Sequence, residues 1–255
     1  MQTIAEALRA DRTVLGTFVK IPALESIDLV VDAGFDFVVV DLEHAQLDER
    51  AASGLVRHAY ALGFPAVVRI ASLDGAVINR LLEAGAAGVQ LSTVRSAATA
   101  VALRDACHYP PAGRRSVSLA HPVARYGSRR LGDYLTEEAA GGPLVIGQFE
   151  TARSDSPIAE IVRPLDVAFI GTTDLSVDLG VPGLLTDPAV TARVSEVAAA
   201  ALAGGVVLGA FAATMPAVTQ IKAWGARYIV YGSELQLLGE TLRQTAASLR
   251  TMLRA

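Results

Sequence analysis

The sequence has few of the features that mark exported, zinc-binding or nucleic-acid-binding proteins. Of its 255 residues only Cys107 is a cysteine, so no disulfide can form within the chain. Without clusters of Cys and His, a structural zinc site is not expected either. The formal net charge is -4 and the basic residues form no run, which argues against nucleic acid as a partner.

Long hydrophobic runs are also absent. Apolar stretches extend over about five to twelve residues before Asp, Arg, Gly or Pro interrupts them, whereas a membrane-spanning helix needs roughly 20. The N-terminal sequence MQTIAEALRADRT is typical of a charged amphipathic helix and has no signal-peptide core, which predicts a cytoplasmic protein without membrane contact. What the chain does have is 52% hydrophobic residues, enough for a globular core. Because the acidic balance argues against nucleic acid, we expect small molecules as its partners.

Short β-branched runs alternate with helical patterns along the whole chain. The runs are almost continuously apolar, as expected for strands buried on both faces of a parallel sheet. Eight strands are predicted, at residues 14–20, 37–41, 66–69, 88–91, 144–150, 167–170, 206–211 and 228–231. Helical patterns lie at about 23–33, 48–62, 74–84, 96–106, 154–163, 187–204, 215–224 and 233–253.

Eight such units without a Pro/Gly/Ser-rich linker predict one α/β domain over residues 1–255. A closed (β/α)8 barrel is favoured, with a doubly wound open sheet as the alternative. Ala-Gly pairs before several strands are typical of glycine that ends a helix. The segment 107–142 has no clear periodicity, so we expect it to cover a functional region or to carry a short extra helix.

Polar side chains follow several of the apolar runs. In a barrel the chemistry is carried by residues at the carboxyl ends of the strands, so these residues are candidates for a site. They include Asp41, Glu43, His44, Arg69, Gln148, Glu150, Thr172, Thr173 and Asp174. We expect them to meet at one end of the barrel.

Two carboxylates in this set, Glu150 and Asp174, follow neighbouring strands. They could converge on one divalent cation whose coordination is completed by water and substrate. Alternatively, each caps the helix that follows it, since acids are favourable at helix N-termini. Glu150 directly continues an apolar strand, where burial without a partner would be costly, so we expect a partner for it.

Arg69 and His44 each allow a functional and a structural interpretation. Arg69 would present its guanidinium to a carboxylate or a developing oxyanion, or form a structural ion pair with Asp41 or Glu43. His44 follows a strand among acids that could make it a general acid/base, or it is a surface residue that caps a loop.

Three further residues carry nucleophilic or titratable groups. Lys20 ends the first strand and could form a Schiff base, although an ion-paired or solvated lysine is the favoured interpretation. His121, in the long segment, is a spare candidate for the site. Cys107 has no orienting group beside it, which favours an inert thiol.

Five segments carry a pattern in a fixed order: AGFDFVVVDLEHA (33–45), FPAVVRI (64–70), YPPAGRR (109–115), QFET (148–151) and FIGTTDLS (169–176). Together they resemble the HpcH/HpaI family of class II, metal-dependent pyruvate aldolases. The resemblance implies a (β/α)8 barrel of the phosphoenolpyruvate/pyruvate type. It also implies a homo-oligomer, a hexamer or trimer, whose last helix is exchanged between subunits.

The resemblance further implies a lyase that cleaves or forms 4-hydroxy-2-oxo acids through a pyruvate enolate and an aldehyde. In the matched motifs, Glu150 and Asp174 would hold Mg²⁺, Mn²⁺ or Co²⁺. His44 would be the acid/base, with Asp41 and Glu43 nearby. The substrate-binding residues implied are Arg69, Gln148, Gly171, Thr172, Thr173 and Phe211.

Several positions depart from the family pattern and leave the aldehyde open. Thr172 replaces a common proline, Gln90-Leu91-Ser92-Thr93 stands where many members have Val-Pro-Met, and Phe211 would narrow the aldehyde side. Two other functions stay open: a carbon-carbon lyase acting on acyl-CoA thioesters, of the citrate lyase β-subunit kind, and a barrel that binds a keto acid without catalysis.

Overall fold

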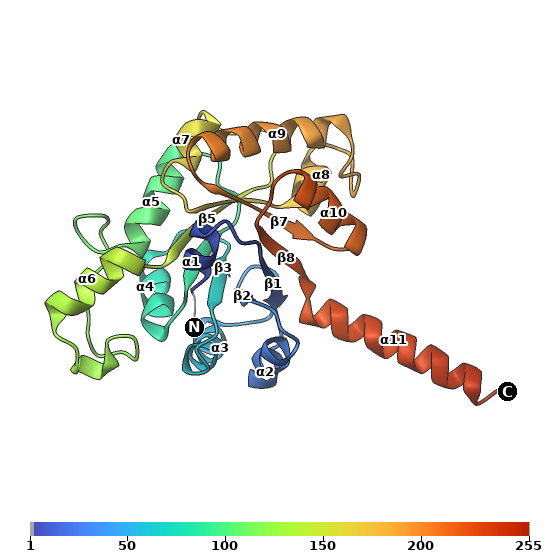
Figure 1. The fold of residues 1–255 in the computed structure, drawn as a ribbon, viewed down its shortest axis with the longest axis horizontal. Coiled ribbons are helices and arrows are strands. Elements are labelled where there is room, and N and C mark those ends of the chain that lie inside the picture. The colour runs from blue at the N-terminus through green and yellow to red at the C-terminus, as the bar shows by residue number, and fades with distance from the viewer. Residues whose placement is uncertain (1–2, 255) are drawn as a thin grey trace.

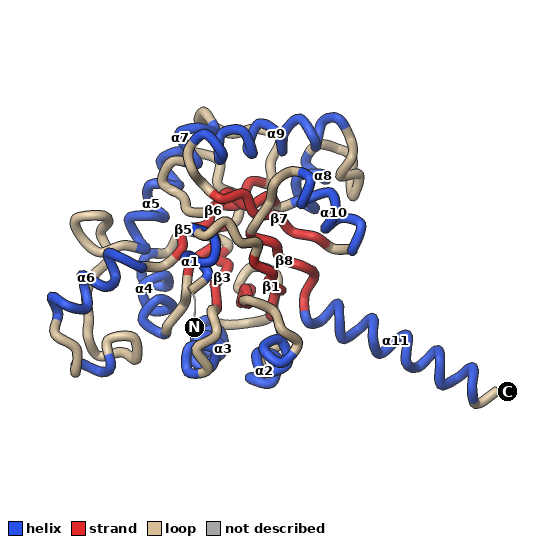
Figure 2. The backbone as a smooth tube through the Cα atoms, in the orientation of Figure 1, coloured by secondary structure: helices blue, strands red, loops and turns tan. Residues whose placement is uncertain are grey.

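Eight parallel strands close into a barrel in which neighbours in sequence are neighbours in space. The computed structural model describes residues 3–254, and Figures 1 and 2 show the strands at the centre with most helices around them. The strands are β1 (Val14–Val19), β2 (Phe37–Asp41), β3 (Ala66–Ile70), β4 (Gly88–Leu91), β5 (Leu144–Phe149), β6 (Val167–Ile170), β7 (Val207–Ala212) and β8 (Tyr228–Ser233). Because β1 also pairs with β8, the predicted (β/α)8 barrel is confirmed and the open sheet is excluded.

Most helices also lie where the periodicity predicts them. They are α1 (Ile4–Arg9), α2 (Leu24–Asp32), α3 (Glu49–Ala61), α4 (Gly75–Ala84), α5 (Ala97–Cys107), α6 (Leu131–Gly141), α7 (Ile158–Val162), α8 (Thr172–Asp178), α9 (Pro188–Ala203), α10 (Met215–Ala223) and α11 (Glu234–Met252). No helix within residues 3–254 is both long and apolar enough to cross a bilayer.

Two helices differ from the prediction. The helix expected at 154–163 begins only at Ile158, because Pro157 disfavours helical backbone in the residues before it. The short helix α8 follows β6 after one residue, Gly171, and was not predicted. Its sequence, TTDLSVD, is too short to show a helical period.

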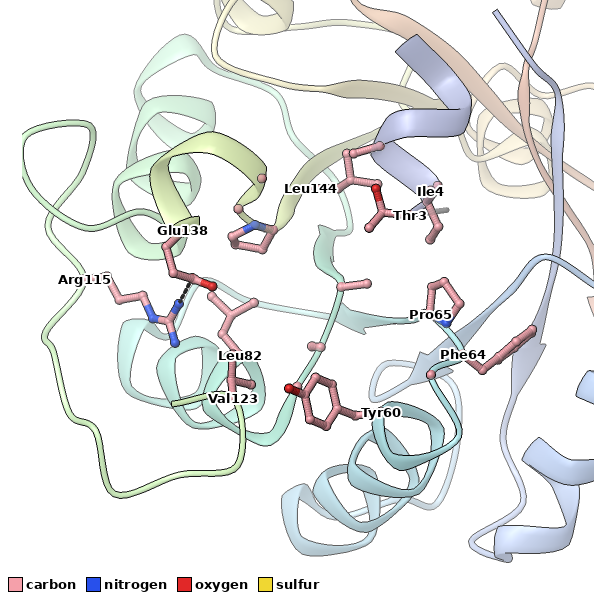
Figure 3. Close-up of a pocket in the computed structure, with 18 residues that line it drawn as sticks. Thr3, Ile4, Tyr60, Phe64, Pro65, Leu82, Arg115, Val123, Glu138 and Leu144 are labelled. Atoms are coloured by element: carbon pink, nitrogen blue, oxygen red, sulfur yellow. Dashed lines mark hydrogen bonds and ion pairs between the residues drawn. The ribbon is translucent and has the colours of Figure 1, made fainter. Parts of the chain in front are cut away.

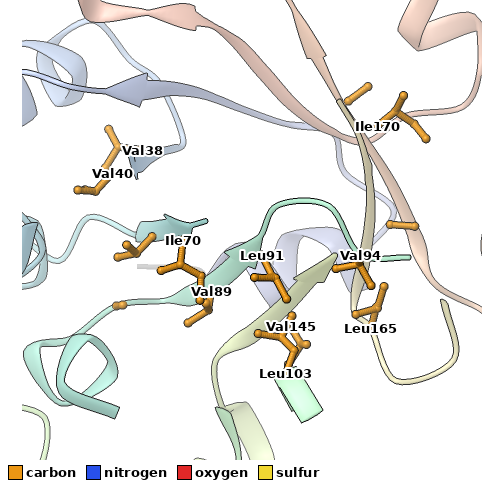
Figure 4. Close-up of a cluster of buried hydrophobic side chains, with 14 of the residues drawn as sticks. Val38, Val40, Ile70, Val89, Leu91, Val94, Leu103, Val145, Leu165 and Ile170 are labelled. Carbon is orange, nitrogen blue, oxygen red and sulfur yellow. The ribbon is translucent and has the colours of Figure 1, made fainter. Parts of the chain in front are cut away.

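The barrel encloses an aromatic core. The ring of Tyr228 lies 4.5 Å from that of Phe37 and 5.9 Å from that of Phe169, between ring centroids. Glycines on β1 and β7 leave room for these rings, since a Cβ at Gly16 would lie 2.4 Å from Phe37. A second apolar layer, shown in part in Figure 4, packs the outward side chains of the strands against the helices.

The long segment between α5 and β5 lies at the opposite end of the barrel from the carboxyl ends of the strands. It leads from the end of a helix to the start of a strand, and it carries the short extra helix α6. His121 is buried there, with its Nε2 2.9 Å from the carbonyl oxygen of Ser118 and its ring 5.8 Å from that of Tyr134. The expectation that His121 could reach the site is therefore wrong for this chain, because helix-to-strand connections lie at the amino ends of the strands.

Helix α11 runs away from the barrel toward the C-terminus (Figure 1). None of its residues is buried within the described chain. Its apolar residues nevertheless recur at helical spacing, with Leu235, Leu238, Leu242 and Leu249 each about half exposed.

We predict that Gly16→Ala destabilises the barrel by about 1–3 kcal/mol, because the added methyl would overlap the Phe37 ring. The matched control is Gly54→Ala in α3, where no atom lies within 4 Å of a built Cβ. The Gly54→Ala change should leave the free energy of unfolding unchanged or raise it by about 0.5–1 kcal/mol, since alanine favours a helix more than glycine does. Urea unfolding of both variants measures the difference, and equal stabilities would contradict the packing described here.

Candidate active site

A cavity of about 400 Å³ opens at the carboxyl ends of the strands. Its lining includes eight of the residues expected at the site: His44, Arg69, Gln148, Gly171, Thr172, Thr173, Asp174 and Phe211. The other three, Asp41, Glu43 and Glu150, lie beside lining residues and contact them. The structure therefore brings the sequence candidates together at one end of the barrel.

An ion pair between neighbouring strands fixes Arg69. Asp41 on β2 and Arg69 on β3 are register partners, and both are buried. Arg69 Nε donates to Asp41 Oδ1 at 2.9 Å and Nη2 donates to Oδ2 at 2.6 Å. This two-pronged contact uses two of the five guanidinium N–H groups, which leaves three for other acceptors.

Besides Arg69, Asp41 also binds Lys20 and the backbone of the turn after β2. Its Oδ2 lies 2.9 Å from Lys20 Nζ, and its Oδ1 accepts the backbone N–H groups of Glu43 and His44 at 3.1 and 3.2 Å. The ion-paired interpretation of Lys20 is thus confirmed. The same contacts shape the turn after β2 that carries His44.

The imidazole of His44 lies at the rim of the cavity. It is 56% exposed, and its Nε2 is 3.7 Å from Glu43 Oε2. The backbone N–H of His44 contacts Asp41, whereas its ring lies near Glu43. A half-exposed imidazole beside a carboxylate can exchange protons with both solvent and a bound molecule.

Glu150 directly follows β5 and is 7% exposed. Its Oε1 accepts the hydroxyl of Thr93 and its Oε2 accepts the side-chain amide of Gln148. These are the partners that its burial requires, and neither is a cation: Glu150 forms no ion pair within residues 3–254. A Cβ at Gly171 would lie 2.7 Å from Glu150 Oε2, so the backbone of residue 171 can approach this closely only as glycine.

Asp174 lies in the first turn of α8 and lines the cavity. Burial raises the pKa of Glu150 above its usual value, and the negative charges of Glu43 and Asp174 raise it further, against the hydrogen bonds from Thr93 and Gln148. The carboxylates of Glu43, Glu150 and Asp174 therefore interact electrostatically at this end of the cavity. The described part of the chain contains no group of three or more Cys, His, Asp or Glu arranged to hold a metal ion.

The aromatic rings of Phe18 and Phe211 also line the cavity. Phe18 on β1 and Phe211 on β7 lie 5.8 Å apart between ring centroids, and the guanidinium carbon of Arg69 lies 4.2 Å from the Phe18 ring centroid. The hydroxyl of Thr172 donates to the carbonyl oxygen of Phe211 at 3.0 Å, which ties the end of β7 to α8.

Sequence reasoning missed three residues that hold the site. Thr93 contacts Glu150, and Gln90 donates to Gln148 Oε1 at 2.7 Å. Glu234 Oε1 accepts the backbone N–H of Ile21 at 2.6 Å and also that of Lys20, so the start of α11 holds the turn after β1. Gln90 could have been found, because it is a polar residue inside an apolar strand run.

A second cavity, of about 270 Å³, lies at the other end of the barrel beside α1 and the segment before β5. Figure 3 shows Arg115 paired with Glu138 on one side of it and the apolar Ile4, Phe64 and Pro65 on the other. One ion pair in an apolar lining offers no set of converging acids and bases. The cavity at the carboxyl ends of the strands, where barrels carry out their chemistry, is the candidate active site.

The fold and this polar cavity are those of a (β/α)8-barrel enzyme. The model of one family, HpcH/HpaI aldolase/citrate lyase, matches residues 14–240. The 4-hydroxy-2-oxovalerate aldolase of Rhodococcus jostii is 33% identical over 251 residues, which cover 97% of this chain and 95% of that protein. The 4-hydroxy-2-oxo-heptane-1,7-dioate aldolase of Salmonella arizonae is 32% identical over 245 residues, covering 95% and 92%.

Among solved structures, an HpcH/HpaI aldolase from Desulfitobacterium hafniense matches with a TM-score of 0.90 at 27% identity, covering 98% of this chain and 97% of that one. The chain belongs to the HpcH/HpaI aldolase/citrate lyase family. The resemblance carried by the five sequence segments is confirmed.

The Asp41 contacts predict a pH-dependent stability. Burial alone would raise the pKa of Asp41, but Arg69 and Lys20 lower it from 3.8 to about 2. A depressed pKa gives stabilisation that is complete above the unfolded value and is lost as the pH falls through the folded value. We expect Asp41→Asn to cost about 3 kcal/mol at neutral pH, because it leaves Arg69 without its buried counter-charge.

That cost should shrink between about pH 4 and pH 2, where wild-type Asp41 itself becomes protonated. Urea unfolding of both proteins across this range measures it, with the exposed Asp133→Asn on α6 as control. A difference that stays constant down to the lowest pH would rule out the stabilising role of the charge.

Proposed function

We propose that this protein is a metal-dependent aldolase that cleaves or forms 4-hydroxy-2-oxo acids from pyruvate, or a similar 2-oxo acid, and an aldehyde. The observation that carries the proposal is the buried carboxylate of Glu150, which forms no ion pair within residues 3–254 and contacts Gln148 in the wall of a cavity that Asp174 and Arg69 also line. Relatives named as aldolases for 4-hydroxy-2-oxo acids support the substrate class.

The residues fit a hard divalent ion such as Mg²⁺, Mn²⁺ or Co²⁺. Glu150 and Asp174 offer only oxygen donors, and their charges repel each other at a place where a cation would relieve the repulsion. Two carboxylates leave the remaining positions to water and substrate, as is usual for Mg²⁺. When bound, such an ion would act as a Lewis acid on the keto oxygen of the 2-oxo acid.

The chain's own residues supply orientation and charge. Arg69 directs its remaining N–H groups toward the oxygen on which negative charge develops, and Asp41 keeps the guanidinium from turning away. Gln148 Nε2 has a second N–H for the 2-oxo acid beyond the one that it gives to Glu150. The first backbone N–H groups of α8, at Thr172, Thr173 and Asp174, lack helical acceptors and can bind the substrate carboxylate.

His44 is the proposed acid/base. It lies at the rim with one nitrogen near Glu43, where it can give or take the proton of the hydroxyl formed from the aldehyde. The aldehyde itself would contact Phe211, which lines the cavity and packs on Phe18. The bulk of Phe211 would limit the size of the aldehyde accepted.

We expect stripping with EDTA to abolish cleavage of a 4-hydroxy-2-oxo acid, and Mg²⁺, Mn²⁺ or Co²⁺ to restore it. Glu150→Gln and Asp174→Asn should lose about 100-fold or more in kcat/KM and should not respond to added metal. Pyruvate release from the 4-hydroxy-2-oxo acid, measured with a coupled assay, provides the readout for cleavage, and pyruvate consumption over a panel of aldehydes provides it for the reverse direction. The matched control is Glu160→Gln, an exposed residue of α7 outside the cavity.

Three results would contradict the proposed metal-dependent aldolase. Full turnover after chelation would remove the metal from the proposal. Borohydride trapping of pyruvate on Lys20 would indicate Schiff-base chemistry. Activity only with acetyl-CoA and glyoxylate would favour the alternative lyase acting on acyl-CoA thioesters; the family description also names citrate lyase.

We also propose a homo-oligomer, a hexamer or trimer, in which α11 packs on a neighbouring subunit. The support is the half-exposed apolar stripe of α11, which has no buried residue in the single chain. Such a stripe of leucines is costly to leave in water and is typical of a helix that packs on another surface.

Leu242→Glu should therefore lower the mass measured by light scattering, because a charge would be buried in the interface without a partner. The control is Ala247→Glu, which places the same charge on the opposite face of α11 at a helical period of 3.6 residues. If both variants keep the wild-type mass, or if the wild type is monomeric, α11 is not an assembly element.

A further inference from the structure

The corner after β4 is fixed from both sides. Ser92 donates its backbone N–H and its hydroxyl to the carbonyl oxygen of Ile70 on β3, each at 3.1 Å. Two residues later, the N–H of Val94 donates to the carbonyl oxygen of Gln148 on β5 at 2.9 Å. The residue between them, Thr93, therefore has little freedom in its backbone.

Thr93 is held in a conformation that its residue type disfavours. Its φ is +53°, in the left-handed region where a β-branched side chain is a true outlier. The side chain is exposed at the mouth of the barrel, so packing in the core does not account for a threonine here. Strain of this kind clusters at functional sites and persists only where the surroundings impose it.

What the conformation achieves is a contact with Glu150. The Thr93 hydroxyl donates to Oε1, while Gln148 donates to Oε2 and is itself oriented by Gln90. A carboxylate has about four lone-pair positions, so the two donors leave about two for other partners. Both carboxylate oxygens of Glu150 are thus oriented by a donor, and lone pairs remain on them for another partner.

We propose that Thr93 is a positioning residue that holds Oε1 of Glu150 in the orientation required to bind a divalent cation. The inference rests on the proposed function, in which Glu150 is a metal ligand. The Ser92 N–H that binds Ile70 and the Thr93 hydroxyl that contacts Glu150 are both supplied by this chain's own corner after β4.

The test is the affinity of the metal-stripped, full-length protein for Mn²⁺, measured by titration calorimetry with no substrate present. Thr93→Val keeps the shape and removes the hydroxyl. Thr93→Gly removes both the hydroxyl and the strain, so it should fold even if the valine variant does not. Thr93→Ser keeps the hydroxyl, and Thr136→Val on α6 is the matched control for loss of an exposed threonine hydroxyl.

We expect the valine and glycine variants to bind Mn²⁺ about 10- to 100-fold more weakly, as when a partner of a metal ligand is lost, with Thr93→Ser and Thr136→Val close to wild type. A merely structural role would instead change the melting temperature and leave the Mn²⁺ affinity unchanged.

Wild-type affinity in either the valine or the glycine variant would overturn the role of the hydroxyl. A wild type that binds no Mn²⁺, and is indistinguishable from Glu150→Gln, would instead overturn the proposed function and this inference with it. The two failures are therefore distinguished by the wild-type titration alone.

Discussion

The ion pair between Asp41 and Arg69 is the constraint on which the candidate site depends. These two side chains are register partners on β2 and β3, both directed into the mouth of the barrel and both buried. One carboxylate binds the guanidinium, the Lys20 ammonium and two backbone N–H groups of the following turn. Three strand ends are thereby fixed relative to one another before any ligand is present.

Much of the fold could be predicted because its signals are local. Buried parallel strands are continuous apolar runs, and each predicted strand lies within about two residues of its observed bounds. Segment 107–142 carries the short extra helix that was one of the two expectations for it, but the expectation that His121 is a spare candidate for the site is wrong. The order of elements already indicates this: the segment follows a helix and precedes a strand, which places it at the amino ends. His121 could not have reached the mouth of its own chain.

The candidate site was predicted in part for the same reason. Asp41, Arg69, Glu150 and Asp174 end apolar runs, and parallel topology brings such ends together. Thr93 could not be assigned a contact, because its hydroxyl reaches Glu150 only through a left-handed backbone that bonds to two flanking strands impose. Glu234, from the far end of the sequence, returns to the turn after β1, and no local pattern encodes such a contact.

The hydrogen bond from Thr172 to Phe211 uses the carbonyl oxygen of residue 211 and leaves its ring uninvolved. The strand end is therefore anchored whatever side chain stands there, whereas at Gly171 even one methyl group would collide with Glu150. A change of side chain at residue 211 would therefore keep this anchor, but it would alter the packing of Phe18, whose ring centroid lies 4.2 Å from the guanidinium carbon of Arg69. The width of the cavity and the position of its arginine are in this way coupled through a single aromatic ring.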